Sequence, residues 1–151
     1  MTGLLRRWPR SAAALAFGTA GLLLPAAWFL PAIVRNQDRV AVALYVGLPG
    51  LAAALAGAAL GRRLLDPVRV RGPGAAALRG AAVASAALVL FAPLFATLFI
   101  WTAPGRTNML GLTALVLVFS IVAVWWAVAI VGAAVGWLLH RLATQAPGAT
   151  A

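Results

Sequence analysis

Charged and imidazole side chains are missing from four long stretches of this 151-residue chain. The stretches are approximately residues 11–34, 40–60, 80–101 and 110–139, and each has at least 21 residues. A helix rises about 1.5 Å per residue, so about 20 residues cross a hydrocarbon core of about 30 Å. With 64% hydrophobic and only 9% charged residues, the chain cannot cover a separate water-soluble domain. The sequence predicts an all-α integral membrane protein, with one domain of four transmembrane helices.

Cysteine and lysine are also absent, and there is a single histidine. The lack of cysteine excludes disulfides, thiolate metal sites and thioether-linked haem. The lack of lysine excludes a Schiff base with retinal or pyridoxal phosphate. The only carboxylates, Asp38 and Asp66, lie in loops that we expect on opposite sides of the membrane, and His140 ends the last stretch. We therefore expect no enzyme activity, no cofactor and no metal site.

The arginines predict the orientation of the four helices. Nine of the twelve lie in the N-terminal segment, the second loop and the C-terminal segment, and three lie in the other two loops. Short arginine-rich loops remain cytoplasmic, so we expect both termini inside the cell. The net charge of +10 comes from these span-end arginines, and we expect no nucleic-acid partner. Exclusive use of arginine, with abundant alanine and glycine, suggests a bacterial plasma (inner) membrane protein.

The connection at residues 61–79 is expected to be a basic cytoplasmic loop. Its five arginines would attract anionic lipid headgroups, at roughly 1 kcal/mol each near the surface, or an acidic partner. The alternative is that they only set the topology. They are Arg62, Arg63, Arg69, Arg71 and Arg79. The composition of residues 144–151 predicts a flexible tail.

The two halves of the chain resemble each other. In each half an arginine opens an alanine-rich stretch, a proline follows 15 or 14 residues later, and the next helix ends in a GxxxG motif. This order suggests two parallel helical-hairpin repeats, although chance within an Ala/Gly/Leu-rich sequence is the alternative. GxxxG allows close helix packing, which we expect within the chain rather than between copies. The glycines are Gly57, Gly61, Gly132 and Gly136.

Pro25, Pro49 and Pro93 lie at similar depths and predict kinks in the first three spans. Such kinks can open a cavity, or they can reflect the ordinary frequency of proline in membrane helices. The proline-free fourth span should be the straightest. Trp125 and Trp126 lie near its middle, although tryptophan prefers the membrane interface. They predict contact with a pigment, quinone, lipid or partner subunit, or space filling against the second span.

No ionisable residue lies inside the spans, which argues against ion coupling. The leading hypothesis is a non-catalytic subunit or accessory component of a membrane complex, in contact with lipid, other membrane subunits or itself. The alternative is a small transporter or channel module for a neutral or lipophilic solute, assembled as a homo-oligomer. Such a module would line a polar cavity with residues near Thr19, Tyr45 and Thr97.

Overall fold

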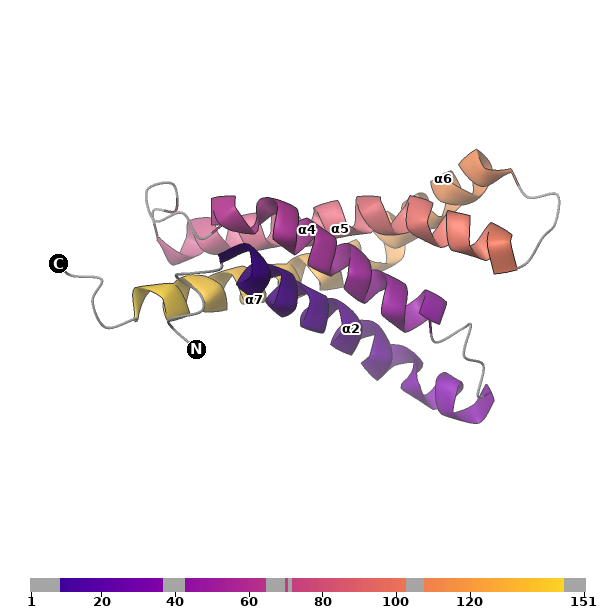
Figure 1. Ribbon diagram of the computed structural model, residues 1–151, viewed down its shortest axis with the longest axis horizontal. Coiled ribbons are helices and arrows are strands. Elements are labelled where there is room, and N and C mark those ends of the chain that lie inside the picture. The colour runs from indigo at the N-terminus through magenta and orange to yellow at the C-terminus, as the bar shows by residue number, and fades with distance from the viewer. Residues whose placement is uncertain (1–8, 37–42, 65–69, 71, 103–107, 146–151) are drawn as a thin grey trace.

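Every element in the described part of the chain is helical. A computed structural model describes residues 9–36, 43–64, 70, 72–102 and 108–145 (Figure 1). Two of the four long helical stretches are continuous α-helices, and the other two each contain a π-helical turn. In chain order the elements are α2 (Pro9–Asn36), the π turn η1 (Ala43–Gly47), α4 (Leu48–Leu64), α5 (Pro73–Thr102), α6 (Met109–Phe119), the π turn η2 (Ser120–Val124) and α7 (Trp125–Thr144).

Four helical stretches are long and apolar enough to cross a membrane. They are Arg10–Ala27, Leu44–Gly61, Pro73–Trp101 and Met109–Thr144, with mean hydropathies of 1.2, 1.6, 2.4 and 2.7. Because each has at least 18 residues, each matches the thickness of a hydrocarbon core. The prediction of an all-α protein with four membrane-length helices is confirmed to this extent.

The connection between the second and third helices is shorter than the expected loop of residues 61–79. Helix α4 continues to Leu64 and α5 already begins at Pro73. Proline is well suited to the first turn of a helix, because that turn needs no backbone N–H donor. Gly72, directly before it, has a φ of 102°, a conformation that favours glycine. At the other end of the chain, α7 ends at Thr144, and residues 146–151 of the expected tail lie outside the described residues.

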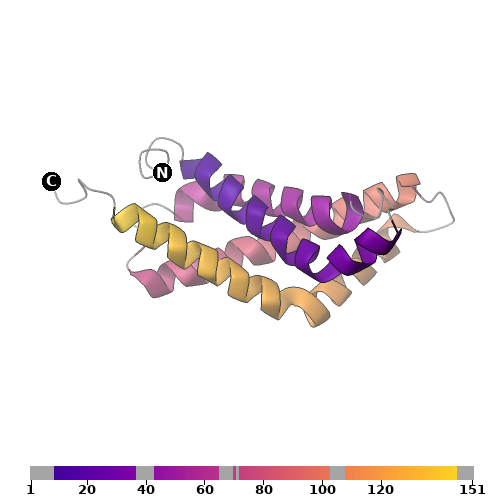
Figure 2. The ribbon, with the colours of Figure 1, turned by 90° about the horizontal axis from the view of Figure 1, so that it is seen from below.

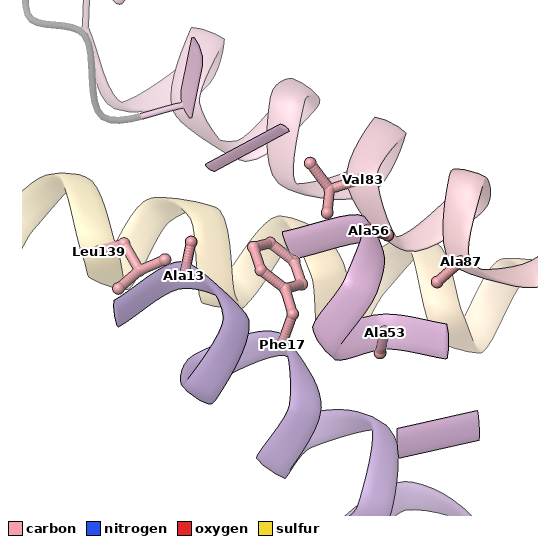
Figure 3. Packing of buried hydrophobic residues seen from close by; sticks show 7 residues of the cluster. All are labelled: Ala13, Phe17, Ala53, Ala56, Val83, Ala87 and Leu139. Carbon is pink, nitrogen blue, oxygen red and sulfur yellow. The ribbon is translucent and has the colours of Figure 1, made fainter. Parts of the chain in front are cut away.

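The helices pack as two antiparallel pairs that meet at α4 and α5. Helix α2 packs mainly on α4, and α5 packs mainly on α7. The start of α2, the end of α4, the start of α5 and the end of α7 lie at the same end of the bundle (Figure 1). All four helices contribute to one buried cluster, in which Phe17 reaches from α2 towards α4 and α5 (Figure 3). The members of this cluster are Ala13, Phe17, Ala53, Ala56, Val83, Ala87 and Leu139.

Small residues bring the helix backbones together in both pairs. A Cβ atom built on Gly57 would lie 2.8 Å from the Ala13 carbonyl oxygen, so α2 and α4 touch backbone to backbone there. In the second pair, a Cβ on Gly132 would lie 2.6 Å from the Gly80 carbonyl oxygen, and one on Gly136 would lie 2.8 Å from the Gly80 Cα. Glycine is the residue that permits such approach between helices. Gly61 is also buried.

The prolines and π turns occupy matching places in the two pairs. Pro25 and Pro93 lie inside α2 and α5, the first helices of the pairs. Pro49 lies near the start of the second span, as the second residue of α4 and two residues after the end of η1. The fourth span is not the straightest as expected: η2 interrupts it, and its direction changes between α6 and α7 (Figure 2). The β-branched Ile121, Val122 and Val124 weaken the α-helix there without a proline.

The glycine contacts predict a sign difference between two alanine substitutions in the fourth span. Gly132→Ala should destabilise the protein by about 1–3 kcal/mol, because the new methyl group meets the α5 backbone. Gly111→Ala should be neutral or stabilising by up to about 1 kcal/mol, since alanine favours the helix and its Cβ would lie 3.8 Å from the nearest Asn108 atom. Equilibrium unfolding in mixed micelles measures both. Equal effects would show that the α5–α7 contact is not tight.

Candidate functional site

Both central tryptophans have their indole N–H groups satisfied within the chain. Trp125 Nε1 donates to Ser85 Oγ at 3.0 Å, and Trp126 Nε1 donates to the Ala123 carbonyl oxygen at 3.1 Å. The preference of tryptophan for the membrane interface comes partly from that N–H, so satisfying it removes one obstacle to a central position. Trp125 therefore contacts the third span, whereas the space-filling interpretation expected contact with the second. Trp125 and Trp126 remain 47% and 59% exposed.

Ser85 links the third and fourth spans by serving as donor and acceptor together. Its hydroxyl donates to the Ala81 carbonyl oxygen at 2.9 Å and accepts the Trp125 N–H. Trp125 is the first residue of α7, directly after η2, so the bond attaches the fourth span to α5 at the point where its helix changes type. Nothing in the sequence pairs Ser85 with Trp125, because the two residues are 40 positions apart.

The surface around these tryptophans is the most exposed apolar part of the bundle. Within an 18-residue window of each span, 6% is buried in the fourth span, against 44% in the second and 33% in the third. Helix α6, from the Asn108 cap to Phe119, has no buried residue, and Ser120 is the first buried residue after it. We call the exposed side chains of α6, η2 and the start of α7 the fourth-span surface. Its most exposed large hydrophobic residues are Leu110, Leu115, Val118, Phe119, Val122, Trp126 and Ile130.

A second group of side chains, all basic, lies at the end of the bundle where α4 and α7 finish. Arg79 Nη1 donates to the Arg63 carbonyl oxygen at 2.8 Å, so the start of α5 caps the end of α4. The Arg141 guanidinium lies over the Trp137 ring, 5.2 Å from its centroid. The spacing of four residues could have suggested this second contact from sequence, but nothing in the sequence pairs Arg79 with Arg63. Arg69 and Arg71 lie outside the described residues, and only the backbone of Arg62 is described.

Aromatic rings gather in the opposite half of the bundle. Phe91, Phe95 and Phe99 form a stripe on α5 with ring centroids 5.5 and 5.9 Å apart, and Tyr45 of η1 lies 5.8 Å from Phe95. The stripe has members on both sides of Pro93. Its contact with Tyr45 joins α5 to the π turn of the second span. These rings lie near Pro93, at the level where a proline-lined cavity is expected for a transporter.

Two of the hydroxyls considered for a polar cavity bond to their own helices. Thr19 Oγ1 donates to the Leu15 and Ala16 carbonyl oxygens, and Thr97 Oγ1 donates to the Pro93 carbonyl oxygen at 2.7 Å. Such back-bonding leaves less of the hydroxyl available to a solute. These contacts do not unite Thr19 and Thr97 in one polar site.

The described residues include no group of three His, Cys, Asp or Glu side chains that could hold a metal ion. Comparison with family models, curated proteins and solved structures found no match to the chain. The fold belongs to the class of all-helical bundles, with four helices that are long and apolar enough to span a membrane. Its candidate site consists of surfaces, namely the fourth-span surface and the arginine-bearing end.

The Ser85–Trp125 bond predicts energetic coupling between the third and fourth spans. In a double-mutant cycle, Ser85→Ala and Trp125→Phe should couple by about 0.6–1.7 kcal/mol, the range of hydrogen bonds between membrane helices. Ser85→Ala combined with Trp126→Phe is the matched control, since Trp126 bonds within its own helix. Unfolding free energies in mixed micelles give both couplings. Coupling of the same size in both pairs would count against a specific bond.

Proposed function

We propose that this chain is a four-span protein of a bacterial plasma membrane that acts as a non-catalytic subunit of a membrane complex. The observation that carries the proposal is the exposure of the fourth span, Met109–Thr144, which is the most apolar of the four. Its buried residues are Ser120, Gly132, Gly136 and Leu139. A helix that is apolar on all sides needs an apolar environment all round, from lipid or from another membrane helix. Two half-exposed tryptophans with satisfied N–H groups offer large, rigid contact area to such a helix.

Small apolar side chains are buried in this bundle and many large ones are exposed, which supports a location in the membrane. The buried apolar residues are mostly alanines, with Phe17, Phe95 and Leu139 among the few large ones. By contrast, Leu15, Leu23 and Leu78 are 70%, 69% and 75% exposed. In water this arrangement would forfeit most of the hydrophobic stabilisation, because burial of large side chains supplies it. In a bilayer, helix association depends on close packing of small residues instead.

We also propose that the chain consists of two parallel repeats, with both termini in the cytoplasm. Gly57 meets Ala13 and Ala14, three and four residues after Arg10. Gly132 contacts Gly80 and Ala84, which are one and five residues after Arg79. The second helix of each pair therefore contacts the first helix in a similar register. Each pair also has a proline within its first helix and a π turn in its second. These coincidences support duplication more strongly than any single motif.

The orientation can be tested with single cysteines, since the natural chain has none. Gln37→Cys and Thr107→Cys should react with a membrane-impermeant maleimide added to intact cells, because the first and third loops are proposed to lie outside. Gly74→Cys, whose Cβ has open space, and Gln145→Cys should react only after the membrane is opened. The reverse pattern, or labelling of all four sites from one side, would contradict the proposed topology.

The subunit role predicts a partner that depends on the fourth-span surface. Purification in mild detergent should retain a stoichiometric membrane protein. The pair Leu115→Ala and Trp126→Ala should lower its recovery by at least about tenfold, because truncating an important interface residue costs more than about 1 kcal/mol. Leu15→Ala with Leu23→Ala is the matched control, because these equally exposed leucines lie on α2. Recovery of the chain alone, or equal loss in both pairs, would contradict the role. A self-oligomer that admits a neutral solute into liposomes would favour the transporter alternative.

A further inference from the structure

Each of the four long helices has at least one arginine at the same end of the bundle. Arg10 lies three residues before the core residue Ala13, and Arg79 lies four residues before Val83. Arg141 lies two residues after Leu139, and Arg63 lies three after Leu60, which packs against the same core. Gly57 contacts Ala13 in the first pair, and Gly136 contacts Gly80 in the second. Counted from these contacts at about 1.5 Å per residue, Arg63 and Arg141 lie about one turn further out than Arg10 and Arg79. The helix ends that carry the four arginines lie together at one end of the bundle (Figure 1).

The chain segments that meet at this end carry a large excess of positive charge. By sequence they hold nine of the twelve arginines and one side-chain carboxylate, Asp66. Arg10, Arg63 and Arg141 are exposed. Two helices, α2 and α5, also begin here, and their first-turn N–H groups add partial positive charge. The electrostatics of this end therefore favour an anion.

Two contacts hold this end in a fixed form. The Arg79 bond to the Arg63 carbonyl ties the start of α5 to the end of α4 and occupies a helix-end carbonyl that would otherwise repel an anion. The Arg141 guanidinium is stacked on the Trp137 ring, which is 40% exposed. An indole favours the glycerol and headgroup level of a bilayer, so the stacked guanidinium is held at the level of lipid phosphates.

We propose that this end of the bundle is a binding site for the headgroup of an anionic phospholipid in the adjoining leaflet. Arg10, Arg63 and Arg141 would bind the phosphate and Arg79 is a positioning residue. Guanidinium groups suit this role because they donate paired hydrogen bonds to phosphate oxygens. The apolar outer faces of α2 and α7 beside the arginines would receive the acyl chains, as the exposed Leu15 and Leu138 illustrate. The site rests on the proposed membrane location and not on the proposed partner subunit.

The test is lipid binding by the purified full chain in detergent, counted by native mass spectrometry. Phosphatidylglycerol should bind in preference to phosphatidylcholine with the same acyl chains. Arg10→Gln, Arg63→Gln and Arg141→Gln together should weaken phosphatidylglycerol binding about 100-fold, since one arginine near a lipid surface contributes about fivefold. The three corresponding lysine substitutions keep the charge, so they should lose much less. Circular dichroism identifies any variant that fails to fold, and the lysine variant then carries the test.

Two further binding measurements distinguish a specific lipid site from a general effect of positive charge. Arg106→Gln removes one charge from the segment joining α5 and α6, and it should leave binding unchanged. Glycerol phosphate, the same headgroup chemistry without acyl chains, should compete only weakly, because the acyl chains are part of the ligand. Equal retention of the two lipids, or unchanged binding by the triple glutamine variant, would overturn the proposal. Loss of a partner subunit in the earlier purification leaves these lipid measurements unaffected, so the two proposals fail separately.

Discussion

The close approach of helix backbones at small residues is the contact on which the rest of this fold depends. At Gly57 against Ala13, and at Gly80 against Gly132 and Gly136, a single added methyl group would collide with backbone atoms. In a bilayer the lipid chains are as apolar as leucine, so no hydrophobic force drives helices together. Dispersion contacts at short range must then supply the association, and they fall away steeply with distance. The glycines determine where the helices of each pair can meet.

That constraint explains why the bundle carries its largest side chains outwards. Backbones in contact leave room for alanine between them, and large residues are displaced to the periphery, where Leu23, Leu110 and Val122 are exposed. Glycine contacts at Gly57 and Gly136 lie near the arginine-bearing end, within about two turns of Arg63 and Arg141. Between α2 and α4 the backbone contacts continue further along the helices, where Gly21 packs against Pro49 and Gly50. The opposite half also has the Phe91–Phe95–Phe99 stripe and its contact with Tyr45. Aromatic packing there adds to the backbone contact between α2 and α4.

Sequence alone predicts the features that repeat along a helix, and it fails where distant segments meet. The number, class and approximate limits of the helices follow from charge-free runs. The start of α5 at Pro73 was missed because the positions of arginines mark the membrane boundary and not the helix boundary. Neither π turn has a reliable sequence signal, and η2 contradicts the inference that a span without proline is straight. The Ser85–Trp125 and Arg79–Arg63 bonds join residues 40 and 16 positions apart, and only the packing brings them together.

The two candidate surfaces differ in the kind of specificity that they can provide. At the arginine-bearing end, the backbone contacts and the Arg79 cap hold charged groups in place, which suits recognition of a small anionic headgroup. The fourth-span surface has no fixed polar group beyond indoles that are already bonded, so it can discriminate only by shape. A hydrocarbon ligand gains little from such a surface, because lipid offers the same contacts everywhere. A rigid membrane helix would gain more binding energy, because small residues on its surface can pack closely against the fixed indole rings of Trp125 and Trp126. On this reasoning the fourth span suits a protein partner, and the arginine-bearing end suits a lipid.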